Sequence, residues 1–393
     1  MGLGRGALEG LVTGVADAAL FGGVFEGRRV LVTGHTGFKG SWVAYWLLAL
    51  GAKVTGYSLD PPTDPSLFEE LGLASRIDHH VGDVRDLARL QQVMAGCSPE
   101  IVLHLAAQPL VRVSYEEPVE TFETNVMGSV NVLESVRLTP GVRALVNVTS
   151  DKCYENREWE FAYRENDPLG GYDPYSASKG AAEIVTAAYR RSFFSAEGAA
   201  AVASARAGNV VGGGDWALDR IVPDCIRALS VGEAVQVRNP DAVRPWQHVL
   251  EPLSAYLWLA SRLLTEGHAF EGPWNLGPLP GGSLSVAEVV GAVIAEWGSG
   301  EWVDPKPHAQ GVHEARFLKL DCAKAADVLE WRPSWSVHEA LRQTTQWYRR
   351  RQQGESVEQL TADCLSAYVA SASGAGAGWT SARASDGSGG AER

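Results

Sequence analysis

The sequence predicts an α/β fold, because strand-like and helix-like segments alternate from residue 29 to residue 206 and a glycine loop follows the first strand. Alternation of this kind builds a parallel sheet with helices on both faces. We expect a Rossmann-type doubly wound parallel sheet with a smaller, interleaved C-terminal substrate lobe. Right-handed crossovers place the carboxyl ends of the strands at one edge, where ligands bind in such sheets.

Apolar runs and helical spacing locate the individual elements. The run Arg29–Thr33 is apolar and strand-like, whereas the segment from Gly40 to Leu50 has helical spacing. By the same reasoning, further strands are expected at 53–59, 79–83, 101–105, 144–149 and 201–206, and further helices at 87–95, 119–136 and 175–194.

Composition divides the chain into four parts. Residues 1–24 are expected to be a disordered or loosely ordered extension, and 25–206 the Rossmann domain. Loops rich in Gly, Pro and Trp characterise 207–365, which we assign mainly to the substrate lobe. A helix near 251–264 is expected to pack back onto the sheet. The segment 366–393 is mostly Gly, Ala and Ser, which is typical of a disordered tail.

Charge and cysteine content argue against several function classes. A net charge of −13 disfavours a nucleic-acid surface, which needs a basic stripe. The apolar stretch at 11–20 is interrupted by Gly14 and Asp17 and is too short to span a membrane. The five cysteines lack metal-ligand spacing, so we expect no metal site and reduced thiols in a cytoplasmic protein.

The glycine loop predicts a dinucleotide site. Gly34, Gly37 and Gly40 lie between the first strand and the first helix, where glycine permits a tight turn and close approach of a pyrophosphate to the helix N-terminus. Asp60, 20 residues beyond Gly40, is positioned to accept hydrogen bonds from the adenosine ribose. An acid there would repel a 2′-phosphate, which favours NAD over NADP. The alternative is a turn residue before Pro61.

Two further segments are expected to contact the cofactor. Asp83 and Val84 end the third predicted strand, close to the place expected for the adenine. The small residues at 105–107 would let a dinucleotide lie directly against the backbone.

Two groups of residues predict proton-transfer chemistry. Ser150, Asp151 and Lys152 follow the buried strand at 144–149. Tyr175 and Lys179 are four residues apart, so on a helix both side chains lie on one face. A neighbouring ammonium favours the phenolate and should lower the pKa of the tyrosine. This arrangement suits moving a proton on and off a sugar hydroxyl.

These motifs together resemble the extended short-chain dehydrogenase/reductase family, and within it the CDP-glucose 4,6-dehydratases. The likeness covers about residues 25 to 350, and its motifs agree in order and in unusual letters. The stretches that carry it are GHTGFKGSW at 34–42, TSDKCYEN at 149–156, GNVVGGGDW at 208–216 and RPWQH at 244–248.

The resemblance implies a redox-neutral reaction on CDP-glucose, in which bound NAD oxidises C4, water leaves across C5–C6 and the hydride returns to C6. In that reaction Tyr175 would take the C4 hydroxyl proton and Ser150 would hydrogen-bond the C4 oxygen. Asp151 would protonate the departing C6 hydroxyl, and Lys179 would hold the nicotinamide ribose. The family also implies a homodimer or homotetramer formed through helices that start near Val119 and Tyr175.

Lys152 has two possible roles. The related dTDP-glucose dehydratases have glutamate at this position, where it removes the C5 proton. A lysine can do the same only when neutral, which needs burial or nearby cations. Alternatively, Lys152 stabilises the enolate as a cation while another group takes the proton.

Motifs and resemblance together give the full expected site. Cofactor contacts are expected from Gly34, Thr36, Gly37, Phe38, Lys39, Gly40, Asp60, Asp83, Val84, Leu105, Ala106, Ala107, Asn125, Tyr175 and Lys179. Substrate contacts are expected from Gln108, Asn209, Trp216, Arg220, Arg244 and His248. The arginines could instead form surface ion pairs, Trp216 could fill the lobe interface, and His248 could be a buried, satisfied histidine.

Two other functions stay open. A nucleotide-sugar 4-epimerase or ketoreductase on the same fold needs Tyr175, Lys179 and Ser150 but no acid/base pair after the serine. Asp151 and Lys152 therefore favour elimination. A non-catalytic NAD-binding interaction protein would have no physical need to keep all of these groups.

Overall fold

The structure is a computed structural model that describes residues 20–278, 281–304 and 317–381. Its centre is a seven-stranded sheet in the order β10-β6-β5-β4-β1-β2-β3, in which every neighbouring pair is parallel. The strands are β1 (Arg29–Thr33), β2 (Lys53–Ser58), β3 (Asp78–Val81), β4 (Ile101–His104), β5 (Ala144–Val148), β6 (Ala201–Ala207) and β10 (Gly272–Leu276). The predicted parallel sheet is confirmed, and its order reverses between β1 and β4, which is the ligand-binding point of doubly wound folds.

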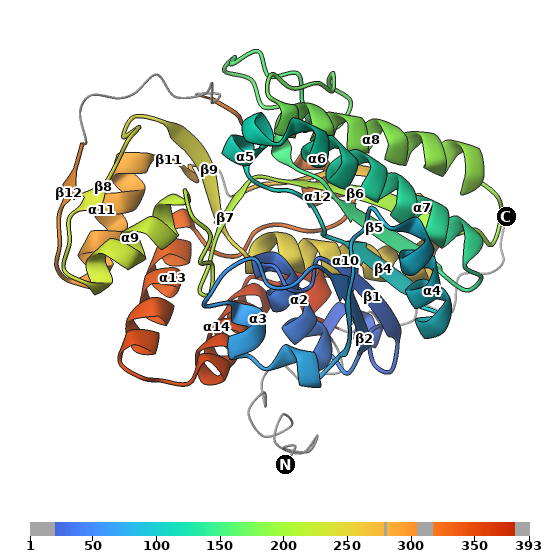
Figure 1. The fold of residues 1–393 in the computed structure, drawn as a ribbon, viewed down its shortest axis with the longest axis horizontal. Helices are drawn as coiled ribbons and strands as arrows, with labels where there is room; N and C mark the ends of the chain where they lie inside the picture. The colour runs from blue at the N-terminus through green and yellow to red at the C-terminus, as the bar shows by residue number, and fades with distance from the viewer. Residues whose placement is uncertain (1–19, 279–280, 305–316, 382–393) are drawn as a thin grey trace, which may run out of the picture.

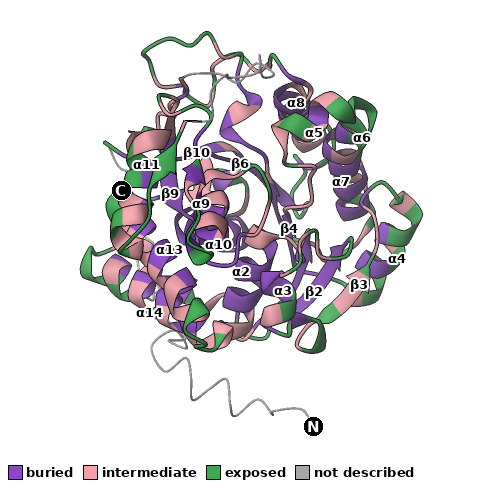
Figure 2. Ribbon diagram, turned by 60° about the vertical axis from the view of Figure 1, so that its left-hand side comes forward, coloured by how far each residue is buried: buried purple, intermediate pink, exposed green. Residues whose placement is uncertain are grey.

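Helices cover both faces of this sheet (Figure 1). Successive residues of a strand point to opposite faces. Accordingly, Val30 and Val32 of β1 pack into the core cluster that contains α2 (Phe38–Ala49) and α10 (Leu250–Glu266). Leu31, between them, packs into the cluster on the other face, against α4 (Leu87–Cys97) and α7 (Gly128–Leu138). Figure 2 shows α10 and the central strands of the sheet as largely buried, whereas the edge strand β3 is intermediate to exposed.

The helix predicted at 119–136 is longer and less regular than expected. Its three consecutive parts are α6 (Pro118–Phe122), a π-helical turn η3 (Glu123–Met127) and α7, which ends at Leu138. Pro118 stands at the first helical position, where its missing N–H costs nothing. The whole segment from α6 to α7 packs beside α8 (Pro174–Phe193).

The helix expected near 251–264 is α10, and it packs on β5 and β6 as predicted. The rest of the chain after β6 forms two small sheets with helices beside them, on the left in Figure 1. The sheets are β11-β9-β7, from β7 (Asn209–Val211), β9 (Val243–His248) and β11 (Ser283–Ser285), and β12-β8, from β8 (Val235–Gln236) and β12 (Trp302–Val303). The adjoining helices are α9 (Ile221–Ser230), α11 (Val286–Trp297) and α13 (Val337–Gln352).

Short helices occupy the connections. They are α3 (Leu67–Glu70), α5 (Val111–Glu116), α12 (Ala323–Asp327), and the 3-10 turns η1 (Leu20–Gly23), η2 (Leu73–Ser75), η4 (Asp151–Cys153), η5 (Gly267–Phe270) and η6 (Gly378–Thr380). Within the described ranges, no helix has the length and apolar character needed to cross a bilayer.

The expectation of a disordered tail from residue 366 is wrong for much of that segment. Helix α14 (Val357–Gly374) continues through its beginning, and Trp379 of η6 is fully buried. The indole of Trp379 stacks on Phe21, with ring centroids 5.0 Å apart, and on Tyr368 at 5.8 Å. The N-terminal extension likewise ends in an ordered turn, since Phe21 is buried. Residues 1–19 and 382–393 lie outside the described residues.

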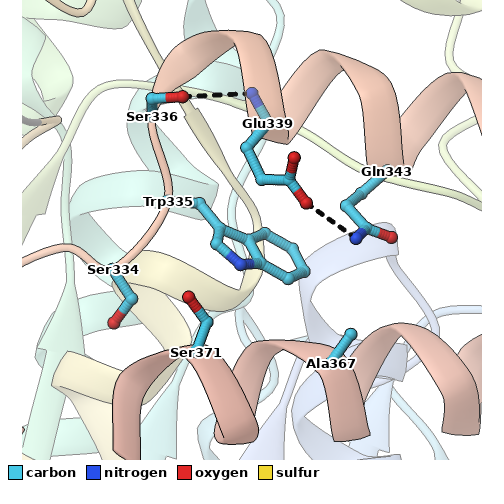
Figure 3. Close-up of a pocket in the computed structure, with 7 residues that line it drawn as sticks. All are labelled: Ser334, Trp335, Ser336, Glu339, Gln343, Ala367 and Ser371. Atoms are coloured by element: carbon cyan, nitrogen blue, oxygen red, sulfur yellow. Dashed lines mark hydrogen bonds between the residues drawn. The ribbon is translucent and has the colours of Figure 1, made fainter. Parts of the chain in front are cut away.

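Helices α10, α13 and α14 meet around one buried carboxylate, and we call this region the helix junction. Glu251 of α10 accepts hydrogen bonds from the backbone N–H of Trp335 (2.7 Å) and Ser334 (3.0 Å), and from the Tyr368 hydroxyl (2.7 Å). A surface cavity of about 380 Å³ adjoins the junction between α13 and α14 (Figure 3). No predicted site residue lines it.

Candidate active site

The Ser150 group lies at the carboxyl end of β5, as predicted. Ser150 caps the turn η4: its hydroxyl accepts from the backbone N–H of Lys152 (3.2 Å) and donates to the Asp151 carboxylate (3.0 Å). Ser150 and Asp151 are buried, whereas Lys152 is half-buried. The turn therefore directs three polar side chains from one strand end.

Helix α8 brings Tyr175 and Lys179 to the same place. The Asp173 side chain caps its N-terminus, accepting from the backbone N–H of Ser176 at 2.9 Å. The Lys179 ammonium lies 6.0 Å from the centre of the Tyr175 ring. Gly180 lets the helix lie close, because a Cβ there would come within 2.7 Å of the Gly170 carbonyl oxygen and 3.1 Å of that of Cys153.

Burial dominates the acid–base properties of the tyrosine. It raises the pKa of Tyr175 to about 12, against the opposing effects of a hydrogen bond with Ser150 and the charge of Arg220, while Asp151 raises it further. We expected Lys179 to lower this pKa; in the chain alone, burial outweighs any such effect. Burial also lowers the pKa of Lys179 to about 8, and Lys39 lowers it further.

Charged groups from the lobe and the glycine loop converge on this pair. Arg220 forms an ion pair with the buried Asp215 at 2.9 Å, and the charges of Arg220 and Tyr175 influence each other. Burial, followed by the charge of Arg220, lowers the pKa of Lys39 to about 8, while Asp151 and Asp215 act to raise it. Lys39 and Arg220 thus lie close enough to Asp151 and Tyr175 to act on a shared ligand.

The glycine loop has the geometry that a dinucleotide pyrophosphate requires. Gly34 has a φ of +74°, and a Cβ there would come within 2.7 Å of the Ala106 backbone nitrogen. A Cβ on Gly40 would come within 2.0 Å of the Gly34 carbonyl oxygen. Gly37 caps α2 without a side-chain hydrogen bond, and the atom nearest to its virtual Cβ is 3.4 Å away. The N-terminus of α2 therefore has no side-chain cap, which leaves its first N–H groups suited to an anion.

The rest of the loop is fixed against β2. The Thr36 hydroxyl donates to the Leu59 carbonyl oxygen and lies 2.9 Å from the Ser58 hydroxyl. Phe38 begins α2, and Asp60, two residues beyond β2, is exposed. An exposed carboxylate beside the loop is consistent with the ribose contact expected of Asp60.

Other expected cofactor residues have protein partners of their own. Both oxygens of Asp83 bind Arg85, at 2.6 to 2.9 Å. Val84 is buried in the core cluster around α4 and α7. The Asn125 amide accepts from the Gln108 backbone N–H (2.9 Å) and donates to Gln108 and Ser178. Asn125 thereby ties the loop after β4 to α8.

That loop carries the small-residue patch. Leu105, Ala106 and Ala107 follow β4 and are half-buried. The Gln108 side chain bonds Leu110 and Thr121, so it holds its own loop in shape instead of projecting free.

The expected substrate residues separate into two groups. Asn209 and Arg244 lie half-buried on the paired strands β7 and β9, and Arg220 stands beside Tyr175. Trp216 instead packs edge-on against Tyr348 with Arg351 over its ring, which matches the alternative of a filled lobe interface.

His248 is the clearest departure from the expected site. It is fully buried, its Nδ1 accepts from the Leu250 backbone N–H (3.3 Å), and its Nε2 lies 3.8 Å from the Cys364 sulfur. Burial lowers its pKa to about 3. His248 therefore matches the alternative of a buried, satisfied histidine, here at the helix junction. Its burial does not fit the expected contact with substrate.

Sequence reasoning missed two buried acids beside the site. Asp215 lies in the stretch 208–216 that carried the resemblance, but only its ion pair with Arg220 gives it a role. Glu183 lies four residues beyond Lys179 and eight beyond Tyr175, so helical spacing alone places it on the same face of α8. Among the described residues, no cluster of His, Cys, Asp and Glu has the geometry to hold a metal.

The fold, the glycine loop and the Tyr175–Lys179 pair define an extended short-chain dehydrogenase/reductase. Residues 31–269 match the family profile described as GDP-mannose 4,6 dehydratase, and the chain belongs to this family.

Curated and solved relatives agree with this assignment. The chain is 51% identical over 339 residues to a CDP-glucose 4,6-dehydratase of Salmonella typhimurium, covering 85% of this chain and 94% of the relative. A dTDP-glucose 4,6-dehydratase of Streptomyces venezuelae, solved with NAD bound, superposes with a TM-score of 0.67 at 26% identity, covering 83% and 98% of the two chains. A UDP-glucose 4-epimerase of Stenotrophomonas maltophila has a TM-score of 0.70 at 24% identity, covering 84% and 100%, and supports the fold.

Proposed function

We infer that this chain is an NAD-dependent CDP-glucose 4,6-dehydratase, which converts CDP-glucose to CDP-4-keto-6-deoxy-glucose and water. The observation that carries this function is the joining of Ser150 and Asp151 to Tyr175 and Lys179 at one strand end. The serine, tyrosine and lysine suit oxidation at C4, and the added acid suits loss of water. Identity of 51% to a CDP-glucose 4,6-dehydratase supports the choice of substrate.

The chain fits NAD at the glycine loop, through Gly34, Gly37, Gly40 and the N-terminus of α2, with Asp60 at the ribose. When bound, NAD accepts a hydride from the sugar and gives it back within one turnover. Tyr175 takes the proton of the C4 hydroxyl, and Ser150 hydrogen-bonds the same oxygen. Because burial keeps the tyrosine protonated in the chain alone, the positive charges that assemble around it in the complex are needed to release its proton.

Asp151, as a protonated carboxylic acid, supplies the proton for the C6 hydroxyl as it leaves and becomes a carboxylate. One oxygen of its side chain already accepts a hydrogen bond from Ser150, so both groups are oriented before the substrate arrives. The pyrophosphate of the substrate meets Arg220 and Arg244, whose planar guanidinium groups bind phosphate oxygens in pairs. Asn209, on the strand beside Arg244, adds a neutral donor.

Lys152 acts in the elimination, either as the base at C5 or as a cation beside the enolate. Exchange of the C5 proton with solvent deuterium separates the two roles. Lys152→Met abolishes this exchange when lysine is the base, but retains it at a reduced rate when lysine is a cation.

We also propose a cytoplasmic homodimer or homotetramer. Exposed apolar side chains support the assembly: Val119 of α6, Met127 of η3 and Ile184 of α8 are 70%, 50% and 57% exposed on neighbouring helices. All five cysteines are free thiols, which is compatible with a reducing compartment.

Incubation of the purified chain with CDP-glucose, without added reductant, tests the function. Loss of one water with no net NADH supports the dehydratase. An unchanged mass with a new stereocentre would identify an epimerase, and no change would leave only cofactor binding. UDP-, dTDP- and GDP-glucose run alongside test the base preference. Deuterium at C4 of the substrate should reappear at the C6 methyl group.

A further inference from the structure

An ion pair lies buried directly behind the catalytic groups. Glu183 of α8 and Arg206 of β6 are joined at 2.8 Å, and both side chains are 3% exposed. Charges buried this deeply are costly unless they are fully paired. Neither residue has a role in the proposed reaction, so the pair needs its own explanation.

Glu183 connects the three elements that carry the site. It accepts from the Thr149 hydroxyl (2.5 Å) at the end of β5, from Ser204 (2.7 Å) on β6, and from Arg206. Thr149 is the residue before Ser150, and Glu183 stands one helical turn beyond Lys179. One carboxylate thus links the strand end that bears Ser150 to the helix that bears Tyr175 and Lys179.

Arg206 extends the connection to the segment after η4 and to the edge strand β10. Its guanidinium donates to the Tyr154 hydroxyl (2.8 Å) and to the Glu165 carbonyl oxygen (3.0 Å). Tyr154 in turn donates to Asn275 of β10 at 2.6 Å. The loop that follows Ser150, Asp151 and Lys152 is therefore held by the same pair.

We propose that Glu183 and Arg206 are positioning residues for the dehydratase reaction, which fix Lys179 and the Ser150 strand end relative to each other and keep the Lys179 ammonium charged. The inference rests on the proposed function only for its turnover readout. It assigns no contact with substrate to either residue.

The charges around Lys179 support this role. Its surroundings contain Lys39 from α2, His104 from β4, Cys153 from η4, Tyr175 one turn earlier and Glu183 one turn later. Burial, then Lys39, lowers the pKa of the lysine. His104, Cys153 and Tyr175 are neutral near pH 7, because burial lowers the pKa of the histidine to about 3 and raises those of the other two.

Glu183 is therefore the anion that opposes loss of the proton from Lys179. Burial acts to raise the pKa of Glu183, but Arg206 and the hydrogen bonds from Thr149 and Ser204 hold it below its usual value. These partners therefore favour the charged form of the Glu183 carboxylate.

Glu183→Gln tests the proposal, with Glu251→Gln as the matched control. Both replace a buried, multiply hydrogen-bonded carboxylate with an amide, but Glu251 lies at the helix junction. NAD⁺ affinity and kcat with CDP-glucose should each fall above a certain alkaline pH, which we call the alkaline limit. We expect Glu183→Gln to lower both alkaline limits by about one pH unit, which corresponds to an activity and affinity about tenfold lower at pH values above the limit. Glu251→Gln should leave both limits in place.

A second variant keeps the test open if the first does not fold, because Glu183→Gln alone leaves Arg206 buried and unpaired. The double variant Glu183→Gln/Arg206→Met removes both charges and should shift both limits in the same direction. Unfolding by urea reports the stability of each variant separately.

Unshifted limits in both Glu183 variants, with stability lowered as in Glu251→Gln, would show the pair to be purely structural and overturn the proposal. The proposed function fails separately, when the unmodified chain releases no water from CDP-glucose. In that case the pH dependence of NAD⁺ affinity still decides the role of the pair.

Discussion

The catalytic edge of the sheet and the helix junction each bury a glutamate, with opposite electrostatic results. At the catalytic edge, Arg206 and two hydroxyl donors hold the pKa of Glu183 below its usual value despite its burial. At the junction, burial raises the pKa of Glu251 to about 7, although two backbone N–H groups and Tyr368 bind the carboxylate. A full positive charge offsets desolvation, whereas neutral donors do so only in part.

The difference teaches what each region is built to do. At the catalytic edge, the ion pair of Glu183 and Arg206 holds the strand end of Ser150 against the helix of Tyr175. The junction joins α10 to α13 and α14, and the hydrogen bonds described for Glu251 all go to Ser334, Trp335 and Tyr368. Changes at the catalytic edge should therefore affect turnover, and changes at the junction should affect stability.

Tyr175→Phe should give the largest effect and tests the first half of this comparison. Loss of the phenolic proton carrier should lower kcat by about 10²- to 10⁴-fold. The ring and its packing remain, so the urea midpoint and bound NAD should not change. Single-turnover formation of NADH with CDP-glucose measures the lost step. Undiminished turnover would exclude the role of Tyr175.

Trp379→Ala tests the expectation that changes near the helix junction affect stability and not turnover. Removal of a fully buried indole that stacks on Phe21 and Tyr368 should cost about 3–5 kcal/mol of unfolding free energy. Equilibrium denaturation measures this cost, with KM for CDP-glucose unchanged in the folded fraction. No loss of stability would mean that the C-terminal segment does not pack as described.

Glu251→Gln separates the two carboxylates by their pH dependence. The pKa of Glu251 is raised from 4.5 to about 7, so the folded chain binds a proton in this interval that the unfolded chain releases. Stability of the unmodified chain should fall as pH rises from about 4.5 to about 7, by up to about 3 kcal/mol from this group.

The glutamine variant should lack that part of the slope. Urea midpoints of both proteins at several pH values across the interval give the difference directly. Parallel curves would show that Glu251 does not titrate there.

His248→Leu is expected to have the smallest effect. The imidazole is neutral and buried, and its replacement leaves the Leu250 N–H without its acceptor, at a cost of about 1–3 kcal/mol. KM for CDP-glucose should be unaltered, whereas Arg244→Met, four residues earlier on the same strand, should raise it. A raised KM in His248→Leu would instead indicate that His248 contributes to substrate binding.

Sequence patterns predicted the sheet and the catalytic groups because both are local. Tyr175 and Lys179 share a helix face, Ser150 to Lys152 follow one strand, and the three glycines form one turn. Each of these arrangements follows from spacing alone.

Features that depend on distant partners were not predictable. His248 lies in a stretch that matched the family motifs, but its ring packs against Trp335 and lies beside Cys364, both far along the chain. The C-terminal segment has the composition of a flexible tail, yet Trp379 stacks on Phe21, which lies more than 350 positions earlier in the sequence. Arg206 could be placed on its strand, but no pattern showed that Glu183 would meet it.

The π-helical turn at Glu123–Met127 determines how its helix would respond to a change in the number of residues. A π turn holds one residue more than an α-helical path, and each residue of an α-helix turns the chain by about 100°. Deleting one residue inside this turn would restore regular α-helical hydrogen bonding and keep Val132 and Val136 of α7 directed into the core. Deleting one residue from the regular helix α7 would instead turn the residues after it by about 100° and take side chains out of the core. The π-helical turn should therefore accept the loss of one residue more readily than α7 does.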